Sequence, residues 1–249
     1  GMAMVYGLLA MQDASYHDVY SELIQLLIEH HGEVPAVMEL GREWEYHNGR
    51  LPEALELALD LVETTPESSD AWFNVISLRM ELAQWEELVV DAQSAIDRFP
   101  LDPVFHYYQG LALRETKQSG KAVKTYESGL NVLIDNPVLE GALASALASA
   151  LRDLKEFDKS EAAFERSIQA HEDAYVLNNH AYYLASRHTM EQSANLLERA
   201  LECSTRANEL MPWEGNFMDT QAYILYKIGR FEEALVWIMR AEENGMMHD

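Results

Sequence analysis

The feature of this sequence that most constrains its fold is a spacing of 34 residues between small and apolar side chains. Ala54, Leu88 and Ala122 are separated by two such steps. The same offset relates Ala58, Ala92 and Tyr126; Leu61, Ala95 and Gly129; Pro66 and Pro100; Pro103 and Pro137; Ala200 and Ala234; and Ala207 and Ala241. A fixed period of this length is typical of repeated supersecondary units that stack on one another.

The stretch FMDTQAYILYKIGRFEEAL, residues 217–235, indicates what one unit is. Apolar residues recur at helical spacing up to Ile228, and Gly229 ends the pattern because glycine adopts a positive φ without steric cost. A second helical pattern begins at Phe231. Its apolar face holds Ala234, Trp237, Ile238 and Ala241, at i, i+3, i+4 and i+7. The unit is therefore predicted to be a helix–turn–helix hairpin.

Several segments carry this pattern with further shared residues. DAWFNVISLRMELAQWEELVVDAQSAIDRFP contains Trp72, Trp85, Leu88, Ala92, Ala95 and Pro100; VMELGREWEYHNGRLPEALELALDLVETTP contains Leu40, Gly41, Trp44, Gly49, Ala54 and Pro66; and FHYYQGLALRETKQSGKAVKTYESGL contains Gly110, Ala122 and Tyr126. These segments resemble the tetratricopeptide repeat. The closing hairpins, with VLNNHAYYLA, are similar to the C-terminal repeats of longer bacterial proteins of this type.

The resemblance implies an all-α fold, a right-handed α-α superhelix (a solenoid) of about seven hairpins without a β-sheet. We expect one array over residues 2–248. Its hairpins are predicted at about 2–33, 34–68, 69–102, 103–137, 141–173, 174–214 and 215–248. The small residues Gly41, Gly110, Ala181 and Ala222 are expected to let paired helices approach closely.

Two departures from the period predict local irregularities. Residues 137–140, PVLE, are expected to lengthen the connection into the fifth hairpin. The sixth hairpin contains about six additional residues, because Ser160 and Ala200 are 40 residues apart instead of 34. Its second helix is predicted to begin near Thr189.

Composition and motifs argue against several classes of function. With 42 acidic and 18 basic residues the net charge is −24, which repels phosphate backbones and anionic membrane surfaces. No apolar run is long enough to span a bilayer. The sequence contains no phosphate-binding glycine loop, zinc-protease motif or nucleophile elbow, so we expect no enzyme and no cofactor.

Two other groups of side chains are candidates for a reactive site. His30, His31 and His47 lack metal-ligand spacing, so no metal site is expected and a solvated helix end is favoured. Cys203 is the only cysteine, and we expect it to be buried and inert. A single thiol fits a cytoplasmic protein, while a periplasmic or lipid-anchored location would follow if an upstream signal had been removed.

The candidate functional surface follows from the resemblance, in which the first helices of the hairpins line a concave groove. The predicted binding residues are Phe73, Asn74, Tyr107, Tyr108, Arg114, Arg152, Asn178, Asn179, Tyr182, Thr220, Tyr223 and Tyr226, with Ser77, Leu111, Ser145, Ser149 and Asp219 on the same stripes. Tyrosine and asparagine suit protein interfaces. Any one of the tyrosines could instead pack between hairpins, because helical spacing does not distinguish the two faces.

The sequence therefore favours a non-enzymatic scaffold that binds a protein or peptide of neutral to basic character. The alternative is a regulatory or assembly segment of a larger secreted or lipid-anchored protein. The last helix raises one further possibility, since the residues that follow it, EENGMMHD, are too few to cover an apolar face. We expect Trp237 or Ile238 to be covered either by a second copy of the chain, giving a homodimer, or by further repeats.

Overall fold

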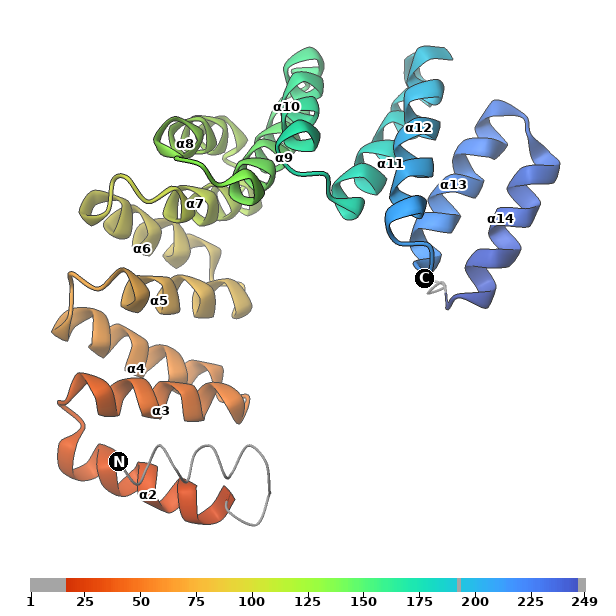
Figure 1. Ribbon diagram of the computed structural model, residues 1–249. Coiled ribbons are helices and arrows are strands. Elements are labelled where there is room, and N and C mark those ends of the chain that lie inside the picture. The colour runs from red at the N-terminus through yellow and green to blue at the C-terminus, as the bar shows by residue number, and fades with distance from the viewer. Residues whose placement is uncertain (1–16, 192–193, 246–249) are drawn as a thin grey trace. The chain divides into compact units, whose positions relative to one another are not determined.

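The computed structural model describes residues 17–191 and 194–245. Within these ranges the chain forms thirteen α-helices and no strand (Figure 1). The helices are α2 (His17–His31), α3 (Pro35–His47), α4 (Leu51–Thr64), α5 (Ser69–Glu81), α6 (Trp85–Arg98), α7 (Pro103–Glu115), α8 (Ser119–Val132), α9 (Pro137–Asp153), α10 (Phe157–Ala170), α11 (Ala174–Glu191), α12 (Ala194–Leu210), α13 (Gly215–Ile228) and α14 (Phe231–Glu243). The predicted first helix of the first hairpin lies outside the described residues.

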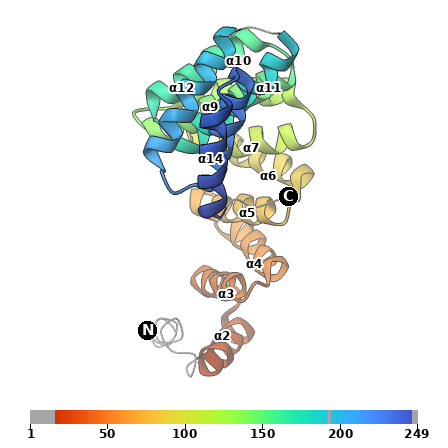
Figure 2. The ribbon, with the colours of Figure 1, turned by 90° about the vertical axis from the view of Figure 1, so that its right-hand side faces the viewer.

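The helices are grouped in two compact units that divide between Ile134 and Asp135. In the first unit α2 to α8 each pack against the next helix along the chain, and the labelled helices follow one another in sequence order in both views (Figure 2). In the second unit α9 pairs with α10, α11 with α12, and α13 with α14. Each unit is therefore a stack of antiparallel hairpins, as the period predicts.

One turn joins the two helices of five hairpins. Residues 49, 83, 117, 155 and 229 all have a positive φ, between 52° and 88°. The amide of the next residue donates to the carbonyl five positions back, as Arg230 N does to Leu225 O at 2.9 Å. This arrangement is the Schellman motif, which satisfies the last free carbonyls of a helix. Glycine occupies the left-handed position at Gly49 and Gly229, whereas Ala83, Lys117 and Lys155 occupy it elsewhere.

The start of the first helix of a hairpin is fixed by a different set of side chains. The Ser68, Asp102 and Asn136 side chains accept hydrogen bonds from the first-turn amides of α5, α7 and α9. Such caps satisfy donors that have no partner within the helix. The polar residues before α5, α7 and α9 and the turns after them therefore set the boundaries of these hairpins.

Two predicted boundaries were wrong. Residues 137–140 form the first turn of α9 and do not lengthen a connection, because Pro137 suits the first helical position and Asn136 caps the helix. Thr189 lies in α11, which runs to Glu191, and α12 begins only at Ala194. The additional residues of the sixth hairpin therefore extend its helices, of 18 and 17 residues, and do not move the second helix forward.

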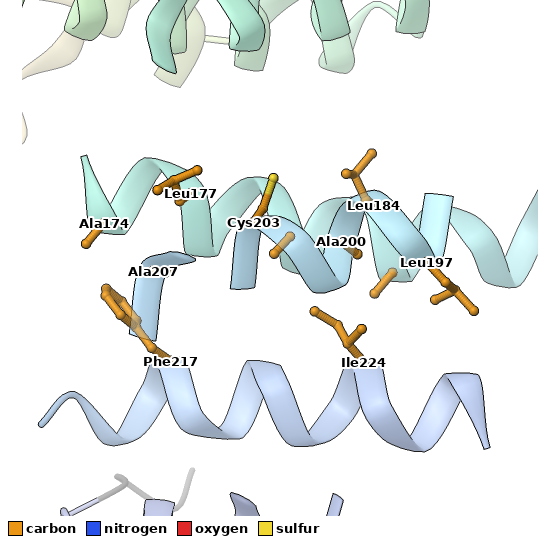
Figure 3. Close-up of a cluster of buried hydrophobic side chains, with 11 residues drawn as sticks. Ala174, Leu177, Leu184, Leu197, Ala200, Cys203, Ala207, Phe217 and Ile224 are labelled. Atoms are coloured by element: carbon orange, nitrogen blue, oxygen red, sulfur yellow. The ribbon is translucent and has the colours of Figure 1, made fainter. Parts of the chain in front are cut away.

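The core of the second unit shows how one hairpin covers the next (Figure 3). Phe217 and Ile224 point from α13 toward α11 and α12, where small residues such as Ala200 and Ala207 let the helices approach. Cys203 belongs to the same cluster and is 2% exposed, so its predicted burial is confirmed. Large residues of each first helix therefore fill the space beside small residues of the preceding hairpin.

Candidate protein-binding groove

A groove with a volume of about 550 Å³ lies in the second unit, between α11, α13 and α14. We call it the C-terminal groove; it is lined by Tyr182, Asp219, Ala222, Tyr223, Tyr226, Phe231, Ala234, Leu235 and Ile238. Four of these side chains are aromatic and one is acidic. Ligand pockets with a mainly apolar lining and a few polar groups fall in this range of size.

The aromatic rings of the groove contact one another in pairs. The centroids of Tyr182 and Tyr223 are 5.8 Å apart, and those of Tyr226 and Phe231 are 5.7 Å apart. Lys227 Nζ lies 5.2 Å from the centroid of the Tyr223 ring, which is cation–π distance. Tyr182 and Tyr226 remain 56% and 60% exposed, so the rings are held in place while offering most of their surface to a partner.

The repeat register explains why these side chains meet. Tyr182 directly follows Ala181, and Tyr223 directly follows Ala222; both alanines are small and buried. The two tyrosines therefore occupy equivalent positions on α11 and α13, which pack side by side. Asp219, Tyr223 and Tyr226 follow at i, i+4 and i+7, which places them on one stripe of α13.

The other predicted residues of the second unit lie outside the groove lining. Arg152 lies over the ring of Tyr183 at 4.8 Å, and Asn179 is exposed. Asn178 is buried, and its side-chain oxygen has no hydrogen-bond partner. Thr220 is buried and donates its hydroxyl to Asn216 O at 3.1 Å, so this hydroxyl satisfies its own helix.

The predicted residues of the first unit form a separate aromatic cluster. Tyr108 packs edge-on against Phe73, at 5.8 Å, and against Tyr107, at 5.4 Å. Burial raises the pKa of Tyr107 and also that of Tyr108 above the ordinary value for tyrosine. Both phenols are therefore neutral at physiological pH. Asn74 donates to Glu39 Oε2 at 3.4 Å, and Arg114 is half-buried at the end of α7.

The sequence stripe missed the contribution of α14. Phe231, Leu235 and Ile238 line the groove from the second helix of the hairpin, whereas the predicted binding residues all lie on first helices. The signal was present, because Phe231 and Leu235 lie 34 residues after Leu197 and Leu201, which pack on the next first helix.

The expected exposure of the last helix requires a correction. Trp237 is half-buried, with the Arg240 guanidinium 5.2 Å from its ring centroid, and Ile238 is half-buried in the groove lining. The exposed apolar side chains of α14 are instead Phe231, Leu235, Val236 and Met239. The unpartnered face of this helix is therefore rotated relative to the one inferred from the sequence.

The polar groups that line the groove are one carboxylate and three phenols. Over residues 17–191 and 194–245, no cluster of three or more potential metal ligands is found, and His30, His31 and His47 are exposed. No helix in those ranges has the length and apolar character needed to cross a bilayer.

Comparisons with known proteins establish the fold. No family model and no curated protein matches the chain. Among solved structures, it is similar to PilW, a type IV pilus biogenesis factor, with 13% identity over 84% of this chain and 93% of that one and a TM-score of 0.68. A tetratricopeptide repeat protein from Parabacteroides merdae matches 98% of this chain and 94% of its own, with 17% identity and a TM-score of 0.66.

A third similar structure is that of YrrB, described as a tetratricopeptide repeat protein with an unusual peptide-binding site. It has 17% identity over 77% of this chain and 93% of its own, and a TM-score of 0.54. Identities this low bear on the fold alone. The chain has the tetratricopeptide repeat fold.

Proposed function

We propose that this chain is a non-enzymatic scaffold that binds a segment of another protein in the C-terminal groove. The observation that carries the proposal is a set of tyrosines, the exposed Tyr182 and Tyr226 and the partly buried Tyr223, that line the same groove as Phe231 and Leu235. Tyrosine is enriched among residues that dominate binding energy, because it buries a large area at a small entropic cost.

Two further observations support a protein partner of neutral to basic character. Asp219 lies in the groove, and the net charge of the chain is −24, so a basic segment is attracted and a nucleic acid is repelled. YrrB, which has the same fold, is described as having a peptide-binding site. Solenoids of this kind offer extended concave surfaces for binding.

The proposal is tested by selecting peptide ligands for the whole chain from a random display library. The affinity of each selected peptide is then measured for the variant Tyr182→Ala/Tyr223→Ala by isothermal titration. We expect the affinity to fall by roughly thirtyfold, since an interface hot spot contributes about 2 kcal/mol or more.

The matched control is Trp213→Ala, which removes an exposed aromatic side chain that lies outside the groove. This variant should bind the selected peptides as the wild type does. If the tyrosine variant retained full affinity for every selected peptide, the groove would not be the binding site.

A further inference from the structure

The second unit contains its own example of how a hairpin end is covered. The first helix of the last hairpin, α13, lies on the preceding hairpin, with Phe217 and Ile224 packed against α11 and α12 (Figure 3). From α12, Leu197 is buried in the same cluster as Phe217 and Ile224, and Leu201 packs against that cluster and is partly buried.

The equivalent positions on the last hairpin are uncovered. Phe231 and Leu235 lie 34 residues after Leu197 and Leu201, and they are 59% and 60% exposed. Ala222 and Ala234 occupy the places of Ala181 and Ala200, which are fully buried in the preceding hairpin. The C-terminal groove is therefore the place that a first helix occupies one repeat earlier. Within the described residues no helix follows α14 to fill it.

The polar contacts that fix α13 are not repeated in the groove. Gln221 of α13 hydrogen-bonds to Ser204 and, at 3.2 Å, to Thr205 of α12. The residues that occupy those two positions on α14 are Ile238 and Met239. A helix in the groove thus meets apolar side chains where α13 meets hydroxyls. The residue of that helix at the position equivalent to Gln221 should therefore be apolar.

The third polar contact of α13 has a charged residue at its equivalent position on α14. Asn208 donates its side-chain amide to Phe217 O, in the first turn of α13, at 3.1 Å. The corresponding residue on α14 is Glu242. A carboxylate cannot donate to a carbonyl, but it is favourable near the N-terminal turn of a helix, where free amides and the helix dipole attract negative charge.

One end of the groove holds larger side chains than the equivalent place in the preceding hairpin, where α13 packs. Tyr226 occupies the place of Ala185, counted from the small residues Ala222 and Ala181, and its ring lies 5.7 Å from that of Phe231. Both rings are larger than the alanine and leucine beside which Ile224 packs in the preceding hairpin. The residue seven positions after the first apolar contact must therefore be small.

We propose that the C-terminal groove binds an amphipathic α-helix of a different protein, docked as the first helix of a following repeat would be. This inference rests on the proposed function and specifies the partner. The helix has a large apolar residue at its first contact, an apolar residue four positions later and a small residue seven positions later. Basic residues border this apolar face, opposite Asp219 and Glu242.

Burial and charge separate this occupant from a second copy of the chain. Helix α13, which fills the equivalent place one repeat earlier, is packed against α11 and α12 of its own chain, so a second copy cannot offer it to the groove. Two copies would also bring together chains that each carry a net charge of −24. A neutral to basic helix avoids both penalties, and the docked position continues an interface already present between α12 and α13.

The experiment uses a peptide with the sequence of residues 214–230 that carries Asp219→Lys, Gln221→Leu and Ile224→Ala, capped at both ends and labelled with fluorescein. Fluorescence anisotropy with the whole chain measures its affinity beside that of the unmodified peptide. We expect the modified peptide to bind at least about tenfold more tightly, because an amide is replaced by an apolar side chain. Circular dichroism of the mixture should show a gain in helix.

Two chain variants test the location. Leu235→Glu places a charge in the groove lining, whereas Val236→Glu places the same charge on the neighbouring exposed residue, which does not line the groove. Leu235→Glu should abolish binding and Val236→Glu should leave it unchanged. Both side chains are at least 49% exposed, so neither variant should alter the thermal unfolding of the chain.

Three results would overturn the inference. Equal losses in the two variants would show that charge alone governs binding. Equal binding of a peptide with Gln221→Pro would show an extended ligand, because proline breaks the helix. A dimer in sedimentation that Leu235→Glu dissociates would make a second copy the occupant. Each result leaves the tyrosine-dependent binding of the proposed function to be judged separately, by the selected peptides.

Discussion

Gly110 is the position at which the smallest substitution should have a large effect on the first unit. It lies within α7, and a Cβ added there would be 2.2 Å from Cε1 of Tyr126 and 2.6 Å from two other ring atoms. Tyr126 is fully buried in α8, so its ring cannot move into solvent. Gly110→Ala must therefore displace either the ring or the α7 backbone.

The size of the effect follows from two opposing contributions. Overpacking a core costs about 1–3 kcal/mol, and separations this short place the cost near the upper end. Alanine is more favourable than glycine inside a helix by about 1 kcal/mol, which offsets part of it. We expect Gly110→Ala to lower the free energy of unfolding by about 2 kcal/mol. With a urea m value of about 2 kcal/mol/M, the midpoint should fall by roughly 1 M.

The assay is urea unfolding followed by circular dichroism, with two glycines as controls. At Gly120, in α8, an added Cβ would have no neighbour within 4 Å, so alanine should stabilise the chain slightly. At Gly41 the nearest atoms are the flexible ends of Ile28 and Leu57, both at 3.0 Å, and alanine should be nearly neutral.

A double-mutant cycle identifies the clash. Tyr126→Leu should cost less in the Gly110→Ala background than in the wild type, because the substitution also removes the ring that the new methyl group meets. A rise in midpoint for Gly110→Ala, matching Gly120→Ala, would refute the reasoning. Strictly additive costs of the two substitutions would show that the contact with Tyr126 is not the cause.

Two further predictions concern titratable groups of the second unit. Glu161 is partly buried, which raises its pKa, but its hydrogen bond to His180 at 3.1 Å and nearby positive charges outweigh burial and lower the pKa below 4.5. Glu161 therefore stabilises the fold above its unfolded pKa, and this contribution is lost as pH falls through the folded pKa. In thermal melts, Glu161→Gln should be less stable than the wild type at pH 7. The difference in melting temperature should close below about pH 4.5. Burial raises the pKa of Cys203 from 9.0 to about 11, so at pH 8 it carries roughly a hundredfold less thiolate, and Ellman's reagent should react with it only after unfolding. Rapid reaction in the native state would contradict that burial.

The fold could be predicted from the sequence because the repeat places the same kinds of residue at the same kinds of contact. The small residue at Gly110 faces Tyr126, as the register requires, and Gly229 adopts the left-handed turn. The boundaries near 137 and 189 could not be predicted in the same way. Added residues can extend a helix or a loop with little change in composition, and local capping by Asn136 decides the first case.

The groove could be predicted only in part. The stripe of Tyr182, Tyr223 and Tyr226 was identified, because equivalent first-helix positions share a face. Thr220 was included although it is one residue from Asp219, which is about 100° around a helix, enough to turn its side chain into the core. The α14 side of the groove depends on what is packed next to it, and helical periodicity alone does not contain that information.

The shared hairpin turn has a consequence for how the stack could be tuned. Ala83, Lys117 and Lys155 occupy a left-handed conformation that costs a non-glycine residue about 1 kcal/mol, and the same turn is held without that cost at Gly49 and Gly229. The shape of the turn is thus imposed by the two helices it joins, whatever residue occupies it. Each hairpin contacts only its neighbours. The identity of this one exposed residue should therefore affect how often its own hairpin opens, without affecting distant hairpins. A glycine at any of the three positions should lower the opening frequency of one hairpin and leave the side chains of the C-terminal groove unchanged.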